Sequence, residues 1–172
     1  MMEVNIPEVV EEVRALFERY ERALIDKDVE VLDDTFWNSP HTVRYAIHEN
    51  GYGFDEIHAH RVRRPPGSGI KVGRRRLVIT TLGRDIATVN LEFDMRGRDM
   101  PARQSQTWVR FPDVGWKVIS AHVSVTESSP AYRAGADGPP LAPFEMAPHG
   151  EGLGADQGRT PRSCQGACQI GT

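Results

Sequence analysis

The side chains best suited to chemistry in this sequence are one tyrosine and two arginines. Tyr20 lies in an apolar helical stripe, so it is either a core residue or a phenol presented to a cavity. Arg44 lies within a strand-like segment, where a buried charge is costly without a partner. It either pairs with Glu49 or Glu92, or it clamps a substrate carboxylate with its planar guanidinium. Arg103, in a later strand-like segment, is suited to hold a second carboxylate.

Four further side chains are candidates for substrate binding. His122, Ser124 and Ser105 lie in strand-like segments and could orient a polar ligand, although a single histidine in a strand is more often structural. Trp37 either walls the pocket or packs in the core. With the arginines, these residues indicate a small anionic substrate.

No nucleophile, metal site or cofactor loop is recognisable in the sequence. It has no G-x-S-x-G elbow, no Gly-rich phosphate loop and no HExxH motif. His58 and His60 are two apart on a predicted helix and point to different sides. The only cysteines, Cys164 and Cys168, would be half a zinc site without a second ligand pair. We therefore expect neither a metal nor a cofactor.

The elements that position these residues follow from hydrophobic spacing and turn chemistry. Helices are predicted from Pro7 to about Leu24, over 29–36 and over 55–64. Asn50-Gly51 is a hairpin signal. Strands are predicted over 41–47, 52–54, 75–82, 85–95, 102–111 and 116–126. Helices and strands are segregated, which indicates an α+β fold with the helices packed on an antiparallel sheet.

Strand alternation sorts the sheet residues into two faces when the last hairpin is centred on Asp113-Val114. One face is largely polar: Thr88, Asn90, Glu92, Arg103, Ser105, Thr107, Ser120, His122 and Ser124. The other is largely apolar: Val89, Leu91, Phe93, Gln106, Trp108, Ile119, Ala121, Val123 and Val125. Either the helices cover the apolar face and water covers the polar one, or a second copy covers the apolar face and the polar face lines a pocket.

Composition sets the broad class of protein. The net charge is -3, which makes nucleic acid a poor partner, and no apolar run is long enough to span a membrane. The start of the sequence lacks signal-peptide character, so we expect a cytoplasmic location. Residues 1–128 are predicted to form the folded domain. Residues 129–172 are expected to be a disordered tail, since 14 of the last 43 residues are Gly or Pro.

Three stretches carry a family resemblance: RYERALIDKDVEVLDDTFW, TVRYAIHENGYGFDEIHAHRVRR and RQSQTWVRFPDVGWKVISAHVS. They resemble the small AtzH/HpxZ-like family of the NTF2-like superfamily, and the AtzH side of it more closely. The resemblance implies a cone of three N-terminal helices on a curved sheet, and a homodimer. It favours the second arrangement of the faces, with the apolar face in the dimer interface. On the first strand Val43, Tyr45 and Ile47 would then face outward, and Thr42, Arg44, Ala46 and His48 inward.

The resemblance also implies a function in the breakdown of cyanuric acid, the conversion of 1,3-dicarboxyurea to allophanate. We expect Arg44 and Arg103 to hold the two carboxylates while Tyr20 delivers a proton, with a pKa lowered by the adjacent arginine. Decarboxylation and amidase-type hydrolysis both remain open. The alternative is a non-catalytic ligand-binding protein or a subunit of a neighbouring amidase.

Overall fold

The computed structural model describes residues 2–65 and 71–126. Its helices are α1 (Pro7–Asp26), α2 (Val29–Thr35) and α3 (Phe54–Arg63). Its strands are β1 (Val43–Tyr45), β2 (Asn50–Tyr52), β3 (Lys71–Leu82), β4 (Ile86–Met95), β5 (Ala102–Phe111) and β6 (Gly115–Val125). The predicted tail, with Cys164 and Cys168, lies outside the described residues.

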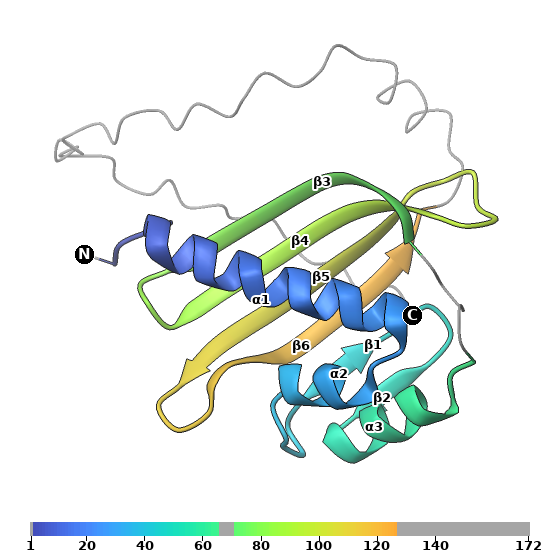
Figure 1. The fold of residues 1–172 in the computed structure, drawn as a ribbon, viewed down its shortest axis with the longest axis horizontal. Helices are drawn as coiled ribbons and strands as arrows, with labels where there is room; N and C mark the ends of the chain where they lie inside the picture. The colour runs from blue at the N-terminus through green and yellow to red at the C-terminus, as the bar shows by residue number, and fades with distance from the viewer. Residues whose placement is uncertain (1, 66–70, 127–172) are drawn as a thin grey trace, which may run out of the picture.

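The strands form one sheet in the order β2-β1-β6-β5-β4-β3. Neighbouring strands are antiparallel except β1 and β6, which run parallel. Figure 1 shows α1 lying across one face of the curved sheet, with α2 and α3 beside the short strands β1 and β2. The predicted α+β cone of three helices on a curved, mostly antiparallel sheet is confirmed.

Helix α1 follows from the apolar stripe predicted in the sequence. Pro7 occupies its first turn, and Val13 and Phe17 are completely buried on its inner face. The helix ends where Lys27 adopts a left-handed conformation, with φ 56°. The Asp28 side chain then accepts a hydrogen bond from the Val31 backbone N–H at 3.1 Å and caps α2. These two local features turn the chain so that α2 can pack beside α1.

The hairpin of β1 and β2 differs from the sequence prediction. Its turn lies at residues 46–49, closed by a 2.8 Å hydrogen bond from the Ala46 N–H to the Glu49 carbonyl. Gly51 is part of β2 instead, opposite Arg44. A side chain at Gly51 would come within 2.8 Å of Ile57 on α3. The glycine therefore permits close packing of α3 on β2. In the sequence, a glycine needed for such packing cannot be distinguished from a glycine needed for a turn.

The last hairpin contains a bulge that the sequence did not reveal. Phe111 pairs with Gly115, one residue away from the predicted partner Trp116. An irregularity between Thr107 and Trp108 then restores the predicted register, so that Thr107 pairs with Ser120. One consequence is that Val118 is the fully buried residue near the turn, and Ile119, predicted on the apolar face, is only half-buried.

The two faces of the sheet were grouped correctly but oriented wrongly for β4, β5 and β6. Val89, Leu91 and Phe93 are at most 2% exposed and belong to one core cluster with the residues of α1. The helices of the same chain thus cover the apolar face, which removes the basis for the predicted dimer interface. Asn90 and Arg103 are exposed on the opposite, polar face.

Candidate active site

A cavity of about 290 Å³ lies between the C-terminal half of α1, the β1–β2 turn and the inner face of the sheet. A smaller hollow of about 20 Å³ adjoins it, and Tyr20, Leu24, Arg44, Glu49 and Arg64 line both. The larger cavity has an apolar wall of Phe93, Met95, Ala121 and Val123. We treat the two hollows as one site. Its size suits a small ligand, at the lower end of the usual range.

The charged side chains around this site are mostly cationic. Among the described residues, two carboxylates line it, Glu21 and Glu49. Five described cationic side chains line it: Lys27, Arg44, Arg61, Arg64 and Lys71. In a partly buried site this excess of positive charge attracts an anion, because water screens the charges less than at the surface.

Tyr20 is the one phenol on the cavity wall among the described residues. It is 5% exposed and its ring lies 6.2 Å from that of Phe17 and 6.1 Å from that of Phe36. No described residue forms a hydrogen bond with its hydroxyl. Burial raises the pKa of Tyr20 above its ordinary value, and the charges of Arg44 and then Arg61 offset part of that rise. The expected lowering of the pKa is therefore wrong, since desolvation outweighs the arginines.

Arg44 occupies the position predicted for it. It faces inward from β1, pairs across the sheet with Ala121, and donates a 3.1 Å hydrogen bond to Glu49. Arg64 lines the same space, and its pKa is lowered by burial and, second, by the positive charge of Arg44. The two guanidinium groups are thus close enough to repel each other, and an anion bound beside both would relieve this repulsion.

Arg61 holds α3 against α2 as well as lining the site. It donates a hydrogen bond to Asp33 at 2.6 Å, and its guanidinium carbon lies 4.2 Å from the centre of the Phe36 ring. Burial lowers the pKa of Arg61, and the hydrogen bond to Asp33 opposes that effect. One side of the Arg61 guanidinium is therefore occupied by Asp33, and its effect on the pKa of Tyr20 is electrostatic, without a hydrogen bond between them.

Three polar side chains meet at the sheet side of the cavity. The Lys71 ammonium donates to Glu21 and, at 2.6 Å, to the Oε1 atom of Gln104. It also lies 4.6 Å from the centre of the Phe93 ring. Burial lowers the pKa of Lys71, and the Glu21 carboxylate beside it acts in the opposite direction. We call Glu21, Lys71 and Gln104 the polar triad.

Of the predicted site residues, the structure brings together Tyr20 and Arg44 and separates the others from them. Arg103, Ser105 and His122 are exposed on the outer face of the sheet, and half-buried Ser124 pairs with Arg103 there. The reason is the reversed orientation of the strand faces. Trp37 stacks on Phe111, with ring centres 4.9 Å apart, and does not line the cavity.

Sequence reasoning missed Arg61, Arg64 and the polar triad. A signal existed for the arginines: they follow the buried Ile57 by four and seven residues, the spacing of one helical face. Gln104 has the parity of Gln106 and Trp108, both of which lie under the helices. Lys71 follows a stretch without periodicity, and nothing in the sequence marks it.

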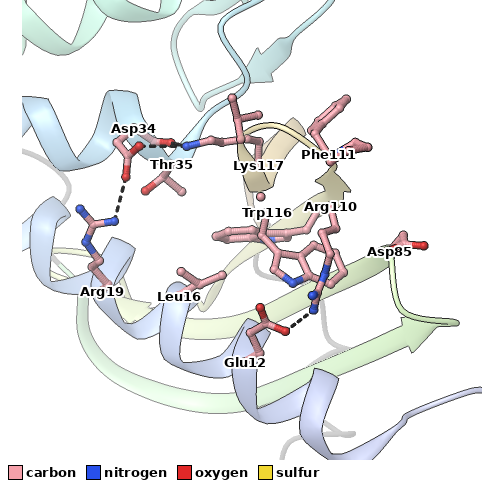
Figure 2. A pocket seen from close by; sticks show the side chains of 14 residues that line it. Glu12, Leu16, Arg19, Asp34, Thr35, Asp85, Arg110, Phe111, Trp116 and Lys117 are labelled. Atoms are coloured by element: carbon pink, nitrogen blue, oxygen red, sulfur yellow. Dashed lines mark hydrogen bonds and ion pairs between the residues drawn. The ribbon is translucent and has the colours of Figure 1, made fainter.

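A larger groove of about 830 Å³ lies between the middle of α1 and the β5–β6 hairpin. Figure 2 shows its charged side chains engaging one another: Arg19 and Lys117 contact Asp34, and Arg110 contacts Glu12. Its three cationic residues are matched by three carboxylates when Asp85 is included. This groove lacks the excess of positive charge found around Tyr20, so we assign the chemistry to the smaller site.

No group of three or more His, Cys, Asp or Glu side chains within residues 2–65 and 71–126 could hold a metal ion. No helix in these ranges is long and apolar enough to cross a membrane.

Comparison with known proteins identifies the relatives of this chain. The model of the AtzH-like family matches residues 2–129. A structure from Pectobacterium atrosepticum, described as a protein of unknown function, is 46% identical over 72% of this chain and 95% of its own, with a TM-score of 0.68. A cystatin-like fold protein from Burkholderia xenovorans is 43% identical over 75% of this chain and 100% of its own, with a TM-score of 0.68.

More distant structures show the fold alone. An NTF2-like superfamily protein from Salmonella enterica is 18% identical and covers 71% of this chain and 94% of its own, with a TM-score of 0.56. A search of curated proteins returned no match.

Proposed function

Because the chain belongs to the AtzH-like family, we propose that its cavity converts 1,3-dicarboxyurea to allophanate in the breakdown of cyanuric acid. The observation that carries this proposal is the set of five cationic side chains and two carboxylates around the buried phenol of Tyr20. Such a site is suited to a small polyanion that must gain a proton. In this proposal the enzyme acts in the cytoplasm and works beside an amidase of the same pathway. It forms a homodimer through a surface other than the apolar sheet face, which its own helices cover.

The cationic groups differ in what they offer a substrate. Arg44 and Arg64 line both hollows and repel each other, so a carboxylate between them is bound by two guanidinium groups. This pair replaces Arg44 and Arg103 as the expected clamp, because Arg103 lies on the other face of the sheet. The clamp holds the carboxylate that the product keeps. A carboxylate that leaves as carbon dioxide loses its charge, and cations bound to it would favour the substrate over the transition state.

The departing carboxylate fits the apolar wall of the cavity. The side chains of Phe93, Met95, Ala121 and Val123 offer it no hydrogen bond, and the Lys71 ammonium over the Phe93 ring is already paired with Glu21. An apolar surrounding disfavours the charged carboxylate and favours neutral carbon dioxide. The position of this wall relative to Arg44 therefore decides which end of the substrate reacts.

Tyr20 supplies the proton that makes the nitrogen a leaving group. The phenol gives its proton to the carbamate nitrogen, the carbon–nitrogen bond breaks with its electron pair staying on nitrogen, and carbon dioxide departs. With its raised pKa, Tyr20 holds its proton at neutral pH. The charges of Arg44 and Arg61 stabilise the phenolate that remains, which then takes a proton from water.

A second function, ligand binding without turnover, is favoured by one observation. Both carboxylates of the site contact cations, Glu49 with Arg44 and Glu21 with Lys71, so neither is an uncommitted general base. A ligand-binding protein or an accessory subunit of an amidase has no need of such a base. Decarboxylation has none either, whereas hydrolysis requires a group that activates water.

The decisive experiment is turnover by the purified protein alone. Freshly prepared 1,3-dicarboxyurea is added, and allophanate and the first carbon product are measured against the spontaneous rate. In water enriched in oxygen-18, decarboxylation releases carbon dioxide without the label, and hydrolysis releases labelled bicarbonate. Arg44→Met should abolish the acceleration. A rate equal to the spontaneous one, with binding of the substrate intact, would establish the accessory function instead.

A further inference from the structure

The polar triad of Glu21, Lys71 and Gln104 takes no part in the proposed proton transfer. All three side chains line the cavity, and Gln104 is 2% exposed. The Lys71 ammonium bridges the other two. Side chains so thoroughly buried need partners for each polar atom, since an unsatisfied donor costs the free energy of its lost hydration.

One atom of the triad lacks such a partner. Lys71 can only donate, so the Gln104 atom that it contacts at 2.6 Å must be the amide oxygen, and this fixes which end of the amide is which. The Nε2 group of Gln104 is then buried without a hydrogen-bond acceptor. It is a buried, unpaired donor on a side chain that lines the cavity.

The charge of the triad indicates what kind of oxygen that is. The Glu21 carboxylate compensates the positive charge of Lys71 directly, and Arg74 lies 3.9 Å from its second oxygen. Because Lys71 is already paired with Glu21, it has no full charge left for a ligand carboxylate, whereas a neutral carbonyl needs no counter-charge. Within the proposed substrates, the neutral acceptor is the carbonyl oxygen of the urea.

We propose that Gln104, held in place by Lys71 and Glu21, donates its Nε2–H to the ureido carbonyl of the ligand, so that the cavity selects ureido acids over plain carboxylic acids of equal length. This inference rests on the proposed function, which supplies the carboxylate clamp at Arg44. It makes Gln104 a specificity-determining residue and leaves the proton transfer to Tyr20.

The test compares two stable probes that differ in the urea alone. N-carbamoylglycine carries a ureido group and a carboxylate, and pentanoate has the same chain length without the urea. Dissociation constants of both are measured by calorimetry for the full-length protein. We expect the wild type to prefer N-carbamoylglycine by about tenfold, the size of one buried hydrogen bond to a neutral acceptor, and Gln104→Met to bind both equally.

Gln106 provides a matched control. It is also 2% exposed, and its Nε2 group likewise has no acceptor, but it lies outside the cavity and its oxygen accepts from Trp108. Gln106→Met should therefore keep the wild-type preference. If Gln104→Met fails to fold, Gln104→Glu retains an oxygen for Lys71 and removes the N–H donor, and it should lose the preference as well.

The outcomes separate this inference from the proposed function. Two results overturn the role of Gln104, whether or not the enzyme turns over dicarboxyurea. One is equal binding of both probes by the wild type, and the other is a preference that survives in a folded Gln104→Met or Gln104→Glu protein. A preference that depends on Gln104, in a protein without turnover, supports the ureido site and refutes the catalytic proposal alone.

Discussion

Replacing Tyr20 with Phe is the sharpest test of the proposed chemistry, because it removes one oxygen atom. The ring keeps its contacts with Phe17 and Phe36. The hydroxyl has no hydrogen-bond partner among the described residues, so its loss should change the free energy of unfolding by less than about 1 kcal/mol. Any large loss of activity in Tyr20→Phe is then a chemical effect.

We expect kcat of Tyr20→Phe to fall by roughly 100- to 10,000-fold, the range for a lost general acid. KM should stay nearly unchanged, since the proton is given in the transition state and the carboxylate is bound by Arg44 and Arg64. The assay is the initial rate of allophanate formation at pH 7, with melting temperature and circular dichroism of each variant. Tyr45→Phe is the matched control, because Tyr45 is 38% exposed on the outer face.

A double variant adds a test of cooperation. Arg44 is the largest of the charges that oppose the raised pKa of Tyr20, so Arg44→Met makes the phenolate harder to form. If the two residues act as a unit, Tyr20→Phe combined with Arg44→Met should lose much less than the product of the single effects. A folded Tyr20→Phe protein with the kcat of the wild type would refute the argument outright and reduce the phenol to a packing residue.

Arg44→Lys keeps the charge but loses the forked geometry, and we expect its KM to rise about tenfold in steady-state kinetics. Arg103→Lys on the outer face is the control, and its KM should equal that of the wild type. Asp34→Asn should lower stability at pH 7 by less than about 1 kcal/mol, because the side chain is half exposed. The hydrogen bond from Lys117 lowers the pKa of Asp34 below its ordinary value of 3.8. The stability that Asp34 contributes is therefore present above that pH and is lost as the pH falls through the folded-state pKa. Urea unfolding of both proteins at pH 7 and pH 3 measures how much the effect of the substitution shrinks. Removing residues 130–172 should shift the melting temperature by less than about 3 °C, since the family match ends at residue 129, and a larger drop in calorimetry would contradict this.

The course of the chain was largely predictable from the sequence because its signals are local. The stripe through Val13 and Phe17 specifies α1, and turn residues bound β5 at Ala102–Phe111, as expected. The predictions that went wrong concern contacts between elements. The close approach of Ile57 to Gly51 and the bulge beside Trp108 depend on the neighbouring helix or strand, and alternation within one strand carries no record of them.

The orientation of the sheet shows the same limit at larger scale. Strand parity established that Arg103 and His122 share one face and that Val89 and Trp108 share the other, and both groupings are correct. Parity does not say which face the helices cover. The amount of apolar surface decides it: α1 brings its own apolar stripe, and burying that stripe against Val89 and Trp108 removes both from water at once.

Only part of the candidate site, Tyr20 and Arg44, could be predicted from the sequence. A binding site for an anion needs cations that the fold buries, so its residues break the pattern of an apolar face rather than follow it. Arg61 on α3 and Arg64 directly after its last residue do this, at four and seven residues from the buried Ile57. The salt bridge to Asp33 accounts for Arg61, and the repulsion between Arg64 and Arg44, which Glu49 offsets in part, favours an anionic ligand beside them. Interruptions of an apolar stripe by arginine are thus the feature to search for when the function of a small α+β domain is sought from its sequence.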